Sequence, residues 1–195
     1  GTVVTGTLVR GEVKVGDKAT LMPEDIEVRV RGIQVHDVES ASSGRGTRTA
    51  LNITGAKSED IHRGQLLGEP GSVWATETLD ARVQWLPDRS LKHGSRVRVS
   101  IGADEAIARA FLNDHNPVLL QLRFERPVGV AKGQSLIVRR YSPPELVCGG
   151  KVGVPVAVQR RKNAKTETID DSLGLLDAVM QAVESSSAGT ATEDV

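Results

Sequence analysis

Short runs of valine, threonine, isoleucine and leucine, broken by glycine or proline about every 8–12 residues, dominate this sequence and predict an antiparallel sandwich or barrel. The segment 26–31 (IEVRVR) shows the pattern at its clearest, since apolar and charged residues alternate strictly along it. Such alternation buries one face of a strand and leaves the other in water. No strand run alternates with a helical pattern before residue 158, which argues against a doubly wound fold. The predicted class is all-β.

The strand pattern occurs in two successive blocks, and Glu69–Ser72 (EPGS) reads as a linker between them. We predict two tandem antiparallel β-barrels, over residues 1–69 and 73–158. The chain opens within a strand-like pattern, so we expect the first strand of the first barrel to be missing. Residues 159–195 predict a basic linker (Arg160–Lys165), a short helix with apolar residues at helical spacing over 173–183, and a disordered tail. The strands predicted for the second barrel are Trp74–Trp85, Arg96–Ile101, Ala106–Leu112, Val118–Phe124, Ser135–Arg140 and Leu146–Val154.

The overall composition is that of a neutral protein with a locally basic middle section. Of 195 residues, 25 are lysine or arginine and 25 are aspartate or glutamate. Residues 73–158 carry twelve basic and eight acidic side chains, an excess of four positive charges. That excess is compatible with an anionic partner, although solvated surface charge is the commoner reason for it. The single cysteine excludes an internal disulfide and favours the cytoplasm. No apolar run is long enough to span a membrane.

Motifs that carry chemistry are absent from the sequence. It contains no G-x-x-x-x-G-K-[S/T] loop, so we predict that this chain neither binds nor hydrolyses GTP and is not itself an enzyme. The four histidines are scattered without paired spacing, which makes a metal site improbable. Cys148 lies in an apolar stretch and is interpreted as a buried structural thiol rather than a nucleophile.

Three segments resemble the second domain of translational GTPases of the elongation factor Tu superfamily. They are Gly1–Thr7 (GTVVTGT), Gly11–Asp17 (GEVKVGD) and Ile61–Leu67 (IHRGQLL). Their glycines would turn the corners of a barrel, and their valines alternate inward and outward.

Further segments are similar to the selenocysteine-specific branch of that superfamily (SelB) more than to Tu itself. The resemblance extends to about Val154, and departures from the family pattern, such as Gln134, indicate a divergent member. The segments that carry it are Val28–His36 (VRVRGIQVH), Leu91–Val99 (LKHGSRVRV), Leu122–Pro127 (LRFERP), Tyr141–Pro144 (YSPP) and Gly149–Gly150.

The resemblance implies a fragment of a larger translation factor. A G domain that binds GTP and magnesium would precede it, and winged-helix domains that read the selenocysteine insertion element of the messenger RNA would follow it. The barrels themselves would bind selenocysteinyl-tRNA for delivery to the ribosome, and no cofactor is expected in this chain. Two alternatives stay open: the equivalent barrels of another translational GTPase, and a β module that binds only protein.

Site residues are also implied by the resemblance. Arg48, in the segment Gly46–Asn52 (GTRTALN), occupies the position of a family arginine that lines the aminoacyl pocket. A guanidinium there would favour an anionic selenolate over neutral serine by a charge-assisted contact. The alternative is a surface arginine on a barrel strand. The arginines of the second barrel predicted to contact tRNA are Arg96, Arg98, Arg123, Arg126, Arg139 and Arg140.

Overall fold

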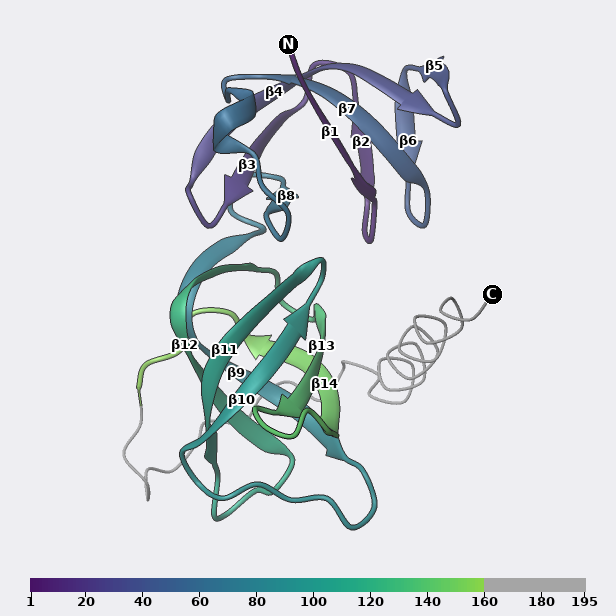
Figure 1. Cartoon of the computed structure of the whole chain (residues 1–195). Helices are drawn as coiled ribbons and strands as arrows, with labels where there is room; N and C mark the ends of the chain where they lie inside the picture. The colour runs from purple at the N-terminus through teal and green to yellow at the C-terminus, as the bar shows by residue number, and fades with distance from the viewer. Residues whose placement is uncertain (160–195) are drawn as a thin grey trace. The chain divides into compact units, whose positions relative to one another are not determined.

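The computed structural model describes residues 1–159, whose regular secondary structure is β-strand apart from one short 3₁₀ turn (Figure 1). They fall into two compact units, of which the first is Gly1–Val73 and the second begins at Trp74. The predicted all-β class is confirmed. The helix predicted over 173–183, the basic linker from Arg160 and the predicted disordered tail lie outside the described residues. Within residues 1–159 no helix has the length and apolar character needed to cross a membrane.

The first unit is a six-stranded antiparallel sheet accompanied by a separate two-stranded ladder. Its strands are hydrogen-bonded in the order β1-β7-β4-β3-β8, with β5 on β4, while β2 pairs with β6. The hydrogen-bonded order of the large sheet ends at β1 and β8, so it does not close. The elements are β1 Thr2–Thr7, β2 Glu12–Lys14, β3 Lys18–Met22, β4 Ile26–Val35, β5 Val38–Ser40, β6 Ser42–Gly44, β7 Arg48–Thr54, the 3₁₀ turn η1 Ser58–Asp60 and β8 Leu66–Gly68.

Alternation along β4 creates the core of this unit. Val28 and Val30 are buried, whereas Arg29 and Arg31 between and beyond them are exposed. The register with β7 shifts between Val30 and Gly32, so Arg31 is an extra residue in a β-bulge.

Two tight turns follow from local chemistry. Gly16 adopts a φ of 99°, which only glycine reaches at little cost, and the carboxylate of Asp17 accepts a 2.8 Å hydrogen bond from the backbone N–H of Lys14. His36 and Asp37 both have positive φ, as the two central residues of a type I′ hairpin do.

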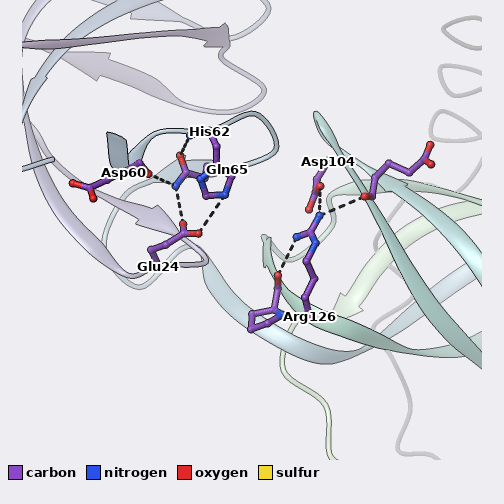
Figure 2. Close-up of polar contacts among 8 residues, drawn as sticks. Glu24, Asp60, His62, Gln65, Asp104 and Arg126 are labelled. Atoms are coloured by element: carbon purple, nitrogen blue, oxygen red, sulfur yellow. Dashed lines mark hydrogen bonds and ion pairs between the residues drawn. The ribbon is translucent and has the colours of Figure 1, made fainter. Parts of the chain in front are cut away.

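The side chain of Gln65 ties the turn after β3 to the segment before β8 (Figure 2). Its amide nitrogen donates 2.8 Å hydrogen bonds to a carboxylate oxygen of Glu24 and to the backbone carbonyl of Asp60. Its amide oxygen accepts a 2.9 Å bond from the backbone N–H of His62, whose ring lies 3.3 Å from Glu24. These bonds hold β8 beside β3.

The second unit is a closed barrel with the strand order β10-β11-β12-β9-β14-β13. Its core draws on all six strands, because alternate residues of each strand point inward. Leu79, Val97, Leu122 and Val138 are completely buried within it. Cys148 is buried in the same core, as the sequence predicts for a structural thiol. The strands are β9 Trp74–Trp85, β10 Ser95–Ile101, β11 Asp104–Leu112, β12 Leu119–Val130, β13 Ser135–Arg140 and β14 Leu146–Val154.

Candidate nucleic-acid interface

Arginines gather on the outer face of the second barrel, where neighbouring strands place them directly opposite one another. Arg96 of β10 opposes Arg109 of β11, and Arg109 opposes Arg123 of β12. On the other side of β10, Arg98 opposes Arg139 of β13. The buried residues of β10 and β11 that alternate with them face the core, so the arginines must face outward. We call these five residues the arginine face.

Arg96 and Arg98 share an aromatic ring and bind different carboxylates. Arg96 donates two hydrogen bonds of 2.8 and 2.7 Å to Glu125, a bidentate pair. Arg98 donates a 3.1 Å bond to Glu105. The two guanidinium carbons lie 4.3 and 5.2 Å from the centre of the Tyr141 ring, within the range of a cation–π contact. The ring thus holds the two positive groups side by side.

The other three arginines of the face make further contacts with rings, amide and hydroxyl oxygens and the backbone. Arg123 stacks on Phe111, 3.8 Å from the ring centre, and donates two hydrogen bonds to the amide oxygen of Gln121. Arg109 donates a 3.3 Å bond to the backbone carbonyl of Gly94. Arg139 donates a 3.3 Å bond to the hydroxyl of Ser100 and lies 3.9 Å from a carboxylate oxygen of Glu105.

Two carboxylates, Glu105 and Glu125, form ion pairs with Arg96, Arg98 and Arg139 of the arginine face. The bidentate hydrogen bonds raise the pKa of Arg96 and lower the pKa of Glu125, so both groups are charged at neutral pH. Like charges opposite each other on adjacent strands destabilise a sheet, and a bound anion would relieve that repulsion.

Two of the six predicted arginines make different contacts. Arg126 donates a 2.6 Å bond to Asp104 and longer bonds to the backbone carbonyls of Glu105 and Pro127, which fastens the irregular part of β12 to the start of β11 (Figure 2). Arg140 donates to the backbone carbonyl of Ser90 at 2.9 Å and lies 3.5 Å from Glu145. Both fasten loops or strand ends. Their contact with tRNA stays a prediction.

Sequence reasoning missed Arg109. The signal was present, because Ala106, Ala108 and Ala110 alternate with Ile107 and Arg109 as an inward–outward strand pattern requires. The structure thus brings together four of the predicted arginines, Arg96, Arg98, Arg123 and Arg139, and adds this fifth one.

Arg48 opens β7 of the first unit, opposite Thr7 of β1. It is exposed, and within residues 1–159 its side chain makes no hydrogen bond, ion pair or ring contact. The described residues also contain no group of three or more His, Cys, Asp or Glu side chains able to hold a metal ion. The role of Arg48 in an aminoacyl pocket stays a prediction.

Comparison with known proteins finds sequences and folds similar to those of both units. Residues 1–68 match the family model of elongation factor Tu domain 2, which covers nearly all of the first unit. The first unit is therefore similar to that domain. The resemblance to translation elongation factors of the selenocysteine-specific type, stated from the sequence, is confirmed by relatives that extend through both units.

Two of these relatives are selenocysteine-specific elongation factors. That of Desulfomicrobium baculatum is 31% identical over 182 residues, which are 89% of this chain and 29% of the relative. That of Escherichia coli strain K12 is 31% identical over 175 residues, or 86% of this chain and 26% of the relative. A crystal structure of a bacterial selenocysteine-specific elongation factor aligns with a TM-score of 0.67 at 28% identity, over 78% of this chain and 25% of that one. The chain therefore spans less than a third of the length of these relatives.

Proposed function

We propose that this chain is the tRNA-binding β part of a selenocysteine-specific elongation factor, and that the arginine face holds the phosphate backbone of selenocysteinyl-tRNA. The observation that carries the proposal is the cross-strand array of Arg96, Arg109 and Arg123. Strands of a closed barrel hold these charges at fixed spacing, so a polyanion meets a preformed surface. Tyr141 and Phe111 contact three of the guanidinium groups, and a guanidinium suits bidentate contact with phosphate.

The carboxylates on the face are compatible with this role. Glu105 and Glu125 keep side-chain exposures of 48% and 43%, and exposed ion pairs contribute little to stability. A phosphate can therefore replace Glu125 as the partner of Arg96 at small cost. The carboxylates then keep the face ordered while no RNA is bound.

Further parts of the proposal concern the whole factor. We assign GTP and magnesium binding to a G domain outside this sequence, because its 195 residues hold no phosphate-binding loop. The ribosome would receive the charged tRNA, and additional domains would read the selenocysteine insertion element in the messenger RNA. Such a factor works in the cytoplasm, where translation takes place.

Filter binding at several salt concentrations tests the arginine face. We expect R96Q/R98Q/R109Q to weaken binding of selenocysteinyl-tRNA and to lower the slope of log affinity against log salt by about 2–3, since each phosphate contact contributes about 0.9. The matched control K14Q/K57Q/R89Q removes three charges that pair with carboxylates elsewhere, and it should leave the slope unchanged. Equal losses in both variants would reduce the effect to net charge and overturn the proposal.

The discrimination of selenocysteine is tested at Arg48 in the full-length factor. An exposed guanidinium without an intramolecular partner has its donors available for a selenolate, which is anionic at neutral pH. We expect Arg48→Ala to weaken selenocysteinyl-tRNA by about ten- to a hundredfold, the value of a lost charge-assisted bond, and to leave seryl-tRNA unaffected. Equal weakening of both would make Arg48 a general tRNA contact.

A further inference from the structure

Two polar side chains are buried on the outer face of the second barrel. Asp80 of β9 and Gln121 of β12 lie directly opposite each other and are 2% and 6% exposed. Leu120 and Leu122, the neighbours of Gln121 along β12, are completely buried in the core, so the Gln121 side chain points outward. A buried amide is costly unless both of its ends are hydrogen-bonded. The position of Gln121 therefore depends on the groups around it.

Both ends of the Gln121 amide are hydrogen-bonded. Its nitrogen donates a 3.0 Å bond to a carboxyl oxygen of Asp80 and a 3.1 Å bond to the backbone carbonyl of Val158. Its oxygen accepts bonds of 3.0 and 2.9 Å from Nε and one terminal nitrogen of Arg123. These bonds fix the amide in one orientation, because the carbonyl can only accept and the arginine can only donate. An apolar residue at this position could make none of them.

Arg123 is held from two sides by this arrangement. Gln121 binds the edge of the guanidinium that carries Nε, and the Phe111 ring lies against its face, 3.8 Å from the ring centre. Phe111 stands directly opposite Gln121 on β11, and its ring meets that of His93 edge-on at 5.3 Å. A free arginine side chain samples many rotamers, so these contacts preorganise Arg123 on the arginine face.

The chain that follows β14 reaches the same side chains. The backbone N–H of Ala157 donates a 2.8 Å bond to the carbonyl of Thr78, which is the residue of β9 directly opposite Arg123. The next residue, Val158, supplies the carbonyl that Gln121 binds. Val158 is 82% exposed, so it is held through its backbone rather than by apolar packing. The position of residues 157–158 is thus linked through Gln121 to Arg123.

We propose that Gln121 is a positioning residue for Arg123, and that the chain leaving the barrel at residues 157–158 acts on Arg123 through the same amide. When Val158 moves away, the amide nitrogen loses one of its acceptors, and the hold of the amide oxygen on the guanidinium weakens. A displacement of the segment after the barrel is therefore transmitted to the arginine face. Its consequence for tRNA rests on the proposed function, whereas the link itself is a property of the free protein.

NMR of the Arg123 Nε–Hε group in the full chain, without RNA, tests the link. The signal is assigned by its absence in R123Q. We expect Q121M to shift it and to speed its exchange with water by about three- to tenfold, the value of one lost hydrogen bond. A157P removes the N–H that binds Thr78 and should cause part of the same change, whereas A157S keeps that N–H and should cause none. The matched control Q65M removes a bridging glutamine of the first unit and should leave the signal unchanged.

Combining the two substitutions separates a relay from a general disturbance. In the Q121M protein, A157P should change the Arg123 signal no further, because the amide that connects the two sites is gone. The fluorescence of Trp74 and Trp85 shows whether the barrel is folded in each variant. Should Q121M fail to fold, A157P compared with A157S decides the link alone. The proposal is overturned if Q121M or A157P leaves the signal in place, or if A157P still moves it without Gln121.

Filter binding of selenocysteinyl-tRNA then separates positioning from contact. R123Q should lower the slope of log affinity against log salt by about 0.9, because one phosphate contact is lost. Q121M should keep the slope and weaken binding by about two- to tenfold, since Arg123 must then be ordered on binding. A slope lowered by Q121M as much as by R123Q would contradict a positioning role. If R123Q leaves tRNA binding unchanged while the NMR link holds, the proposed function fails at Arg123 and the positioning by Gln121 stands.

Discussion

The two units bury the apolar residues of their antiparallel sheets to different extents. In the second barrel every strand contributes buried residues to one core, and the hydrogen-bonded order closes on itself. In the first unit the fully buried cluster comes from β3, β4 and β7, while Val4 of β1 and Val13 of β2 are only partly buried. Val3 and Val38 of the first unit are 62% and 66% exposed. Closure therefore concentrates apolar burial in the second unit.

The two units also differ in the contacts that their charged side chains make. The arginines of the second barrel bind carboxylates, aromatic rings or backbone carbonyls of their own unit, as Arg96 and Arg126 do. Lys18, Arg29 and Arg48 of the first unit have no such partner within residues 1–159. These arginines of the second barrel are therefore held by contacts within their own unit, whereas Lys18, Arg29 and Arg48 of the first unit are not.

Truncation of one core leucine in each unit should produce the largest effects. Leu122 is completely buried in the closed barrel, and Leu51 is 9% exposed on β7 next to the edge strand β1. We expect Leu122→Ala to cost about 3–5 kcal/mol of unfolding free energy and Leu51→Ala about 2–3, because the more open site can relax around the cavity. Urea unfolding measures both.

The two tryptophans allow unfolding of the second unit to be followed separately from that of the first. Trp74 and Trp85 both lie in β9, so their fluorescence reports the second unit alone, while circular dichroism reports both units. Leu51→Ala should shift the dichroism transition and leave the fluorescence transition in place. A cost for Leu51→Ala that equals or exceeds that of Leu122→Ala would break the comparison.

Substitution of glycines within strands should have the next largest effect on the free energy of unfolding. A Cβ at Gly150 of β14 would lie 2.1 Å from the backbone oxygen of Arg82, so the two strands would have to separate. A Cβ at Gly32 of β4 would lie 3.7 Å from the Cβ of Asn52, an ordinary contact. We expect Gly150→Ala to destabilise the second barrel by about 1–3 kcal/mol and Gly32→Ala to be nearly neutral. Similar thermal shifts for the two variants would contradict the difference in packing.

Much of the second barrel could be predicted from its sequence. The predicted strands Trp74–Trp85, Ser135–Arg140 and Leu146–Val154 match the observed ones, because alternation and glycine-rich turns delimit them. The strand predicted to end at Phe124 continues to Val130 through a register shift. A bulge allows a strand to contain charged residues and Pro127. In the sequence pattern alone these residues indicate the end of a strand.

The candidate site could be predicted only in part. Which arginines face outward follows from alternation, but which of them lie side by side depends on strand order, and β10 pairs with both β11 and β13. The hydrogen-bond partners of these arginines are still harder to predict from the sequence. Glu125 lies on β12, which does not pair with β10, yet its carboxylate reaches Arg96. Such a contact spans the intervening strand β11 through two long side chains, and Glu125 lies where the register of β12 shifts.

The reactivity of a buried thiol measures how often the unit around it opens, so it can be compared between the two units. Burial raises the pKa of Cys148 to about 12, so the thiol stays protonated and covered at neutral pH. We expect iodoacetamide to modify the native protein about a thousandfold or more slowly than the unfolded protein, since modification requires opening of the barrel. Because the folded pKa is raised, this thiol also contributes stability that is present below pH 9.0 and is lost as the pH rises towards 12.

A matched thiol in the first unit completes that comparison. Ser43 is 5% exposed on β6, so Ser43→Cys combined with Cys148→Ala places a buried thiol there. It should react faster than Cys148 under the same native conditions. Equal protection of the two thiols would show that the first unit opens as rarely as the second.

The smallest expected effect concerns two surface carboxylates, one in each unit. The hydrogen bonds from Arg96 lower the pKa of Glu125, and those from Ser42 and then Lys14 lower the pKa of Glu12. Each carboxylate therefore contributes stability that is present above the ordinary value of 4.5 and is lost as the pH falls through the lower folded pKa. If phosphate takes Arg96 away from Glu125, RNA binding should raise the pKa of Glu125 back towards 4.5 and leave that of Glu12 unchanged. Carboxyl NMR titration with and without tRNA measures both, and an unmoved Glu125 would mean that Arg96 keeps its carboxylate when RNA binds.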